Sequence, residues 1–527
     1  MRPPVWRPPV ALSPAEQAVV RRVRRAKLFV WLREHRHELL DAGFQAELAA
    51  AYQDSPRGHP PVPPAQLALA TILQAYTGAS DDEVLEATVM DRRWQLVLDC
   101  WDAGQAPFGK ATLVGFRARL IACELDRRLV EQTVVLARKT GGFGAGPLRA
   151  ALDSSPLWGA GRVEDTDNLM GHALRKALGV VARQQGRGLA AVAELAAEVG
   201  APVLGGSSLK AALDCDWDDP TARQHALVVV VETLDAVESF LAGAQLAAAG
   251  APAQAAAALG VARQVCEQDV DRGEDGTPSI RQGVAKDRRI SVEDPQMRHG
   301  RKTKSVRVDG YKRHVLRDLD SGLVPAVGVT PANVPEASVT GQIAADLAVQ
   351  GTILAELHID RAYLASTLVR DRDQDLQVFC KTFPVRNGPR FTKTAFGLDF
   401  DRGELTCPAG VAMPFALGGK VQFPAEVCAA CPLRVQCTTS TRGRSVQIHP
   451  DERLLVELRA RQLTAQGRAK LRERVQVEHA LAHIGHWQGR RARYLGVRKN
   501  LFDLRRVAVV HNLHVLARQP VAQLQAA

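Results

Sequence analysis

The sequence has few aromatic residues and no long apolar segment. Aromatic side chains make up 5% of the 527 residues. Polar residues interrupt every apolar run before it reaches the roughly 20 residues of a membrane-spanning helix. The start of the chain lacks the positively flanked apolar segment of a secretion signal. We therefore expect a soluble, cytoplasmic protein with no membrane partner.

Cysteine is sparse except in one stretch. Four of the nine cysteines lie between 407 and 437, in contrast to the even framework of a secreted disulfide protein. These are Cys407, Cys428, Cys431 and Cys437, spaced C-x20-C-x2-C-x5-C. Four thiolates in a loop-rich stretch predict a structural Zn²⁺ site, although the spacing is not that of a standard zinc finger and cysteines that bind nothing remain an alternative. We expect the other five, Cys100, Cys123, Cys215, Cys266 and Cys380, to be ordinary buried residues.

Acidic residues are in deficit relative to basic ones. Lys and Arg total 68 and Asp and Glu total 57, an excess of 11 positive charges that favours a polyanionic partner such as nucleic acid. Basic residues gather at 21–27, 298–307 and 490–499. Each cluster alone fits a solvated surface equally well, so the clusters support DNA binding only together.

The first part of the chain is predicted to be helical. Ser13 and Glu16 have the spacing of a capping box. We expect further helices over 65–76, 84–90 and 112–129. The last of these carries Arg117 and Arg119, which suits a helix-turn-helix-like DNA-binding module, although compact helical scaffolds share the pattern. Only the Pro-rich start, residues 1–9, is expected to be disordered.

Strand signals alternate with helical ones in the middle of the chain. Predicted strands cover 148–152, 311–319, 323–330, 353–359 and 376–381, with predicted helices over 335–349 and 362–372. An Ala-rich helical block at about 165–285 separates the first strand from the others, so we interpret it as an insertion. This order predicts an α/β domain with a mixed sheet.

Three carboxylates occupy the ends of these predicted elements. Asp153 follows the first strand and precedes the loop residues 154–156, and Asp360 follows the strand 353–359. Glu478 lies on a predicted helix over 472–484. Oxygen ligands from three acids could converge to hold hard cations. Glu473, five residues before Glu478, is rotated by about 140° around that helix and is expected to lie in its solvated start.

The motifs around these acids resemble the DDE-type transposases of bacterial insertion sequences, over roughly residues 61–516. The matching stretches are 152–155, 310–314, 320–323, 330–333 and 359–363. The resemblance implies a ribonuclease-H-like fold in which Asp153, Asp360 and Glu478 hold two Mg²⁺ ions, with Mn²⁺ as an alternative. Many relatives carry the pattern Tyr-x2-Arg-x3-Glu-x6-Lys. This chain keeps Arg474 and Glu478 but has Leu471 and Gly485 in place of the Tyr and the Lys.

By this resemblance the chain is a DNA transposase that cleaves the terminal inverted repeats of its element and joins them to target DNA. It is expected to act in the bacterial cytoplasm in association with the nucleoid, as a homodimer on paired ends. The expected DNA contacts are Arg474, Arg490, Arg491 and Arg493. Two alternatives are a ribonuclease-H-like nuclease or resolvase without strand transfer, and a non-catalytic DNA-binding protein derived from a transposon.

The expected architecture has four parts. A helical DNA-binding domain covers 10–145, and a ribonuclease-H-like α/β domain with the helical insertion covers 146–395. A cysteine-rich zinc-binding insert follows at 396–450, and the last part of the catalytic domain, with Glu478, covers 451–520.

Overall fold

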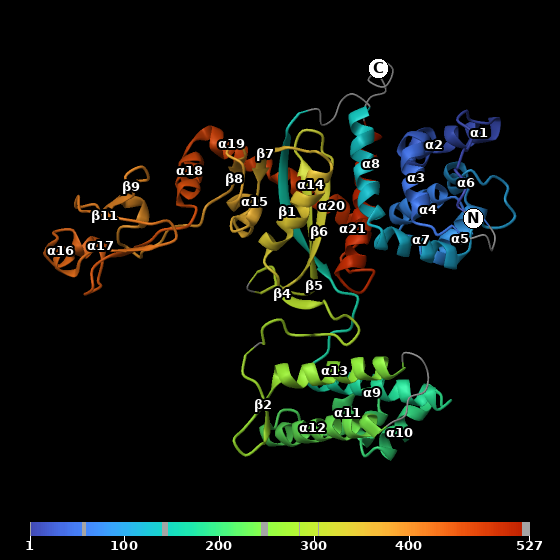
Figure 1. The fold of residues 1–527 in the computed structure, drawn as a ribbon, viewed down its shortest axis with the longest axis horizontal. Helices are drawn as coiled ribbons and strands as arrows, with labels where there is room; N and C mark the ends of the chain where they lie inside the picture. Colours follow the sequence, from blue (N-terminus) through green and yellow to red (C-terminus); the bar gives the residue numbers. More distant parts are fainter. Residues whose placement is uncertain are drawn as a thin grey trace.

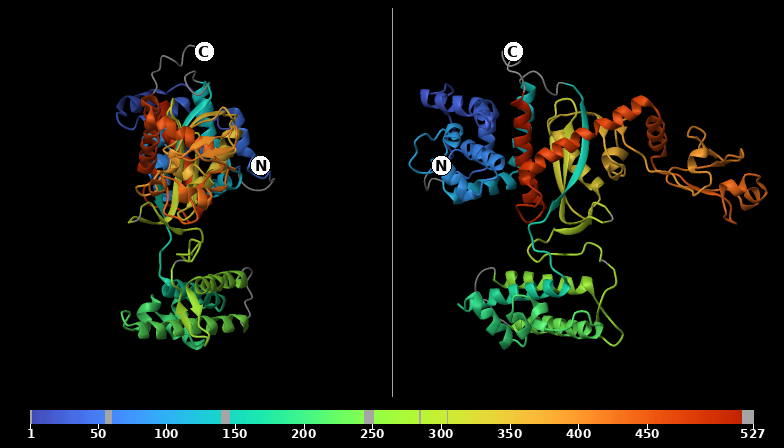
Figure 2. Two further views of the ribbon diagram at one scale, coloured as in Figure 1. Left: turned by 90° about the vertical axis from the view of Figure 1, so that its left-hand side faces the viewer. Right: turned by 180° about the vertical axis from the view of Figure 1, so that it is seen from behind.

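The computed structural model describes residues 2–54, 60–139, 146–243, 251–283, 285–303 and 305–518. A mixed sheet lies at the centre, flanked by an N-terminal group of helices, a separate helical lobe and an extended cysteine-rich arm (Figure 1). Figure 2 shows from two further sides that the lobe is joined to the sheet through thin connections. No helix within the described ranges is long and apolar enough to cross a membrane. The mixed α/β class is confirmed.

The N-terminal part is helical, as predicted. Its helices are α1 Pro14–Arg22, α2 Lys27–Leu39, α3 Ala42–Ala50, α4 Pro64–Thr77, α5 Asp81–Met90, α6 Arg92–Leu98, α7 Lys110–Ala122 and α8 Leu125–Lys139. Ser13 and Ser80 each cap a helix through a full capping box. The single helix predicted over 112–129 is wrong, because the chain turns at Glu124, which has a positive φ of 53°, and divides it into α7 and α8.

The Pro-rich start is ordered from residue 2, in contrast to the prediction. The backbone N–H of Trp6 donates to Gln45 Oε1 at 2.8 Å. The guanidinium of Arg36 lies 5.1 Å from the centre of the Trp6 ring and donates to the Pro9 carbonyl at 3.1 Å. Packing against α2 and α3 therefore orders a segment whose composition alone suggests disorder.

The central sheet combines antiparallel and parallel strands. Its strands are β1 Leu148–Trp158, β4 Arg298–Arg301, β5 Arg307–Asp318, β6 Ala326–Pro331, β7 Leu354–His358 and β8 Gln377–Phe379. The order is β4-β5-β1-β7-β8, with β6 also paired to β5. β5 pairs antiparallel with β1, β4 and β6, whereas β1-β7 and β7-β8 are parallel. The predicted hairpin at 311–330 is thus confirmed, and the edge strand β4 was not predicted.

Helices cover both faces of this sheet. On one face Ala151 and Val315 pack with Leu481 of α20 and with α21. On the other, Leu152 and Leu357 pack with α14 and α18. Because successive side chains of a strand point to opposite faces of the sheet, alternate residues pack into two separate cores. The helices concerned are η3 Glu336–Val339, α14 Thr340–Val349, η4 Arg361–Tyr363, α15 Thr367–Arg370, α18 Glu452–Leu463, α19 Ala465–Glu473, α20 Val475–Gln488 and α21 Val497–Leu516.

Two of these helices differ from the prediction. The helix expected over 362–372 is reduced to the single turns η4 and α15. The helix expected over 472–484 is two helices that meet at Arg474, which is both the C-cap of α19 and the N-cap of α20.

The remaining elements form the lobe and the arm. The lobe has its own core and contains α9 Thr166–Gln184, η1 Leu189–Ala191, α10 Val192–Glu198, η2 Pro202–Gly205, α11 Leu209–Leu213, α12 Pro220–Gly243, α13 Ala251–Asp269, β2 Val270–Arg272 and β3 Pro278–Ile280. The arm contains η5 Lys393–Ala395, β9 Gly397–Asp399, β10 Glu404–Thr406, β11 Ala412–Pro414, β12 Lys420–Gln422, α16 Ala425–Ala430, α17 Arg434–Cys437 and β13 Ser445–Gln447. It extends away from the sheet, and its core is small (Figure 1).

Candidate active site

Asp153 and Asp360 lie on the same face of the sheet. In the parallel register of β1 and β7, Ala151 is opposite His358. Each aspartate comes two residues further along, so both carboxylates point toward α20. The prediction that the first strand ends at Asp153 is wrong, because residues 154–158 continue to pair with β5. The end of β1 is held as well, since Trp158 N–H donates to the Arg490 carbonyl at 2.9 Å.

Arg474 connects two of the three acids. Its Nη1 lies 2.5 Å from Asp153 Oδ2, and its Nη2 lies 3.2 Å from Glu478 Oε1. Asp360 has a local partner, since its side chain accepts the Ala362 N–H at 2.8 Å and caps η4. The oxygens of the three acids do not all lie within 4.8 Å of one another, because the guanidinium is between Asp153 and Glu478.

The electrostatics of Asp153 are those of a buried acid beside another acid. Its side chain is 15% exposed. Burial raises the pKa of Asp153, and the neighbouring Asp360 carboxylate raises it further, whereas Arg474 and the Ser154 N–H lower it. A positive charge at this position therefore stabilises the ionised form. In the structure Arg474 supplies that charge.

The acids open onto a cavity of about 900 Å³ that is lined by side chains of both signs. Asp153, Asp360 and Glu478 are among its lining residues. The basic residues around it are Arg301, Lys302, Lys312, Arg313, Arg474 and Arg490. They come from β4 and the residue after it, from β5, and from the two ends of α20, so three separate parts of the chain combine carboxylates with positive charge at one opening.

A buried hydrogen-bond chain supports the segment that carries Asp360. Tyr363 and His314 are fully buried, and the Tyr363 hydroxyl lies 2.8 Å from His314 Nδ1. His314 Nε2 is 2.9 Å from the Thr330 hydroxyl. Burial lowers the pKa of His314 to about 3, so the ring is neutral and can donate through one nitrogen only. These three residues belong to the motif stretches 310–314, 330–333 and 359–363, which thus meet in one buried contact.

Arg313 accounts for the glycine at position 485. The Arg313 guanidinium is buried and donates to Ser155 Oγ at 2.8 Å and to Gly489 O at 2.9 Å. A Cβ added at Gly485 would lie 3.1 Å from its Nη2. A side chain at 485 would therefore compete for space with Arg313, which ties β5 to the end of α20.

The basic residues expected to contact DNA have different surroundings. Arg490 is exposed and lines the cavity. Arg491 donates to the Gly159 carbonyl at 3.1 Å, and Arg493 donates to the Gly78 carbonyl at 3.0 Å. Those two guanidinium groups therefore connect parts of the fold. Arg117 is buried against Asp81 at 2.5 Å, so it is not available as a DNA contact of the predicted helix-turn-helix-like module.

Two other sequence expectations change. Glu473 is not at a solvated helix start, since it pairs with Arg149 and lies 3.7 Å from Lys470. Cys123 is exposed rather than buried.

The four clustered cysteines line a common cavity of about 300 Å³ in the arm. Cys407 Sγ accepts the Val411 N–H, and Cys428 Sγ accepts the Arg444 N–H, each at 3.4 Å. Burial raises the pKa of Cys437, and the three other sulfurs add to this effect. All nine cysteines are free thiols, and no three of the four sulfurs in the arm lie within 4.8 Å of one another.

Comparison with known families found two domain models that match parts of the chain. The family model described as Transposase DDE domain matches residues 406–517, which include the four cysteines, Arg474 and Glu478. The model described as Transposase domain (DUF772) matches residues 27–119. Two separate stretches of the chain therefore match transposase domains, and these matches support the function of a DNA transposase. This transposase is therefore an enzyme that cleaves DNA and transfers strands. No curated protein and no solved structure is significantly similar to it.

Several residues around the cavity of this transposase were not predicted to belong to the site. Arg301 and Lys302 belonged to a recognised basic cluster, but only the pairing of β4 with β5 brings them beside the acids. Another member of that cluster, Arg298, is instead buried and bonded to Asp287 at 2.7 Å. The sequence did contain one indication of this difference. Successive side chains of a strand over 298–301 point to opposite faces, and in the structure Arg298 points inward and Arg301 outward.

Proposed function

We propose that Asp153, Asp360 and Glu478 are the metal ligands of this transposase and that the surrounding basic residues hold DNA phosphates. The observation that carries the proposal is that acids from β1, from the end of β7 and from α20 line one cavity together with six basic side chains. A site for phosphodiester chemistry needs both kinds of charge, carboxylates for the cation and basic groups for the polyanion.

The donor set fits a divalent cation such as Mg²⁺ or Mn²⁺. Mg²⁺ prefers a few carboxylates completed by water and substrate phosphate. In the structure Arg474 contacts both Asp153 and Glu478, so a bound cation would have to replace this one guanidinium. Two bound ions would supply charge stabilisation to the attacking and leaving oxygens. On DNA binding, Arg474 would turn from the acids to a phosphate, and Arg490 would hold the backbone nearby.

We infer a ribonuclease-H-like fold for the catalytic domain. The strand order β6-β5-β1-β7-β8, with three antiparallel strands followed by two parallel ones, supports this assignment. Asp153 on the central strand and Asp360 after its parallel neighbour then lie where the family has its first two acids. The proposed domains are helical 10–145, catalytic 146–395 and 451–520, and a zinc-binding arm over 396–450.

We propose one structural Zn²⁺ on Cys407, Cys428, Cys431 and Cys437. The two N–H···S bonds to Cys407 and Cys428 and the shared cavity support it, because backbone donors to sulfur favour thiolates. A cation would also relieve the repulsion that raises the pKa of Cys437. The small core of the arm explains why a metal would be needed there.

The decisive experiment uses DNA that carries paired element ends, in Mg²⁺, with cut and joined products separated on a gel. Asp153→Asn, Asp360→Asn and Glu478→Gln are each expected to abolish cutting and joining while DNA binding is retained. Strand transfer by any of the three variants would refute the assignment. Cut but unjoined product from the wild type would favour a nuclease, and binding without metal-dependent cutting would favour a non-catalytic protein. The same complexes, analysed by mass photometry, test the proposed homodimer on paired ends.

A further inference from the structure

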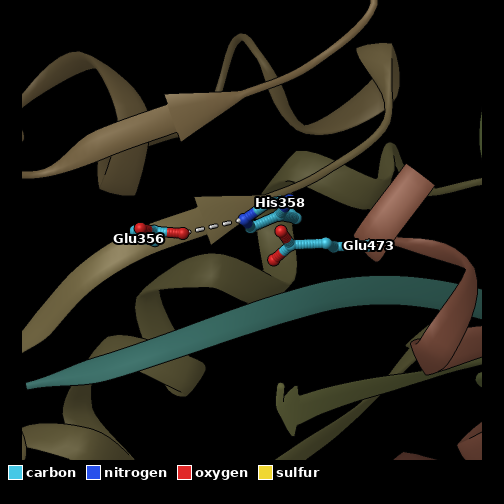
Figure 3. A group of neighbouring side chains, drawn as sticks. All are labelled: Glu356, His358 and Glu473. Carbon is cyan, nitrogen blue, oxygen red and sulfur yellow. Dashed lines mark hydrogen bonds and ion pairs between the residues drawn. The ribbon is translucent and has the colours of Figure 1, made fainter. Parts of the chain in front are cut away.

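A group of charged side chains lies next to the proposed metal ligands on the same sheet face. Arg149 of β1 and Glu356 of β7 are opposite each other in the parallel register, four residues before Asp153 and Asp360 respectively. Figure 3 shows Glu356 and His358 on one strand and Glu473 approaching His358 from the neighbouring helix. The group therefore connects the two acid-bearing strands with the helix pair α19–α20.

The contacts within this group are dense. Arg149 Nε lies 3.0 Å from Glu356, its Nη1 lies 2.6 Å from Asp320, and its Nη2 bonds Glu473. Lys470 Nζ lies 2.9 Å from Glu356 and 3.7 Å from Glu473. Two cations and three carboxylates thus interlock at the point where α19 ends.

A metal ion is the first alternative to consider for this group. The ligand atoms of Glu356, His358 and Glu473 lie within 4.8 Å of one another. However, Arg149 and Lys470 already neutralise the two carboxylates. Burial acts to raise the pKa of Glu356, but hydrogen bonds from Lys470, Arg149 and His358 lower it to about 2. A divalent cation would have to displace two fixed positive charges, so the geometry favours a permanent ion-pair network.

We propose that this network positions Glu478 for metal binding, with Glu473 as its key positioning residue; the inference rests on the proposed function. Glu473 is the last residue of α19, and the next residue, Arg474, begins α20 and contacts Asp153. Arg149 and Asp153 project from the same face of β1. The Arg149–Glu473 pair therefore fixes where α20 starts above β1, and α20 carries Glu478 one turn later.

The test compares the metal requirement of Glu473→Gln with that of the full-length wild type. We expect the Mg²⁺ concentration for half-maximal cleavage, and the dissociation constant for Mn²⁺ alone measured by electron paramagnetic resonance, to rise about three- to tenfold, the effect of one partly exposed pair with several partners. Glu473→Asp keeps the charge and is expected to be intermediate. Glu457→Gln is the matched control, because it removes an exposed helix pair with Arg461 that does not contact this group.

Different results would contradict the positioning role of Glu473 and the proposed function. If Glu473→Gln lowers only the melting temperature and leaves both metal constants at the wild-type value, the network is merely structural and the inference is overturned. A Glu478→Gln variant that still cleaves would instead overturn the proposed function. Should Glu473→Gln fail to fold, Lys470→Gln provides the same comparison, since Lys470 contacts both Glu356 and Glu473.

Discussion

Replacing Arg474 by Gln should tighten metal binding while it weakens catalysis. In the structure the guanidinium donates to Asp153 at 2.5 Å and to Glu478 at 3.2 Å. A cation bound by both acids must displace these bonds. Because Glu478 is 53% exposed, only the bond to Asp153 is expected to contribute fully. A hydrogen bond between charged groups contributes about 1.5–3 kcal/mol.

That energy translates into a measurable change. At about 1.4 kcal/mol per factor of ten, Arg474→Gln should bind Mn²⁺ about 10- to 100-fold more tightly in the absence of DNA. Cleavage should nevertheless fall, because the same guanidinium is proposed to contact a phosphate. Electron paramagnetic resonance of free Mn²⁺ measures the affinity directly.

Two variants control for charge at this position and in the wider cavity. Arg474→Lys keeps the positive charge and should stay near the wild-type affinity. Arg490→Gln removes a charge from the same cavity, at a residue that is not bonded to the acids, and should change the affinity little. Unchanged or weaker Mn²⁺ binding by Arg474→Gln would show that the guanidinium helps to assemble the acids and does not compete with the metal.

Three further predictions concern stability and the arm. Cys428→Ser should reduce zinc from about one ion per chain and make residues 396–450 sensitive to protease, whereas Cys123→Ser should change neither; wild-type protein free of zinc would contradict the site. Asp126→Ala removes one of the two carboxylates paired with the buried Arg505, 3.2 Å away, and should lower the free energy of unfolding by about 3 kcal/mol in urea titrations. A loss below about 1 kcal/mol would refute that estimate. A hydrogen bond from Arg117 lowers the pKa of Asp81 from 3.8 to about 2, so its stabilisation is complete above pH 3.8 and is lost as the pH falls toward 2. Asp81→Asn should remove this part of the acid dependence, and an unchanged profile would count against it.

The sequence by itself determined features whose causes are local. Ser13 and Ser80 cap their helices because the Glu three residues later completes each capping box within one turn. The polar turn with Gly322, whose φ is +80°, specified the hairpin between β5 and β6 in the same way. The alternation of predicted strands and helices was sufficient to predict the mixed α/β class. The spacing of apolar residues and the turn residues that indicate each element lie within a few positions of one another.

Only the tertiary structure decided the roles of residues whose partners are distant in sequence. Residues 154–156 look like a loop, yet they form strand because β5, more than 150 positions later, supplies the hydrogen bonds. Arg117 looks like a DNA contact but pairs with Asp81, and Glu473 looks solvated but pairs with Arg149. A charged side chain carries no local sign of whether an opposite charge will lie beside it. That depends on the packing of elements far apart in the chain.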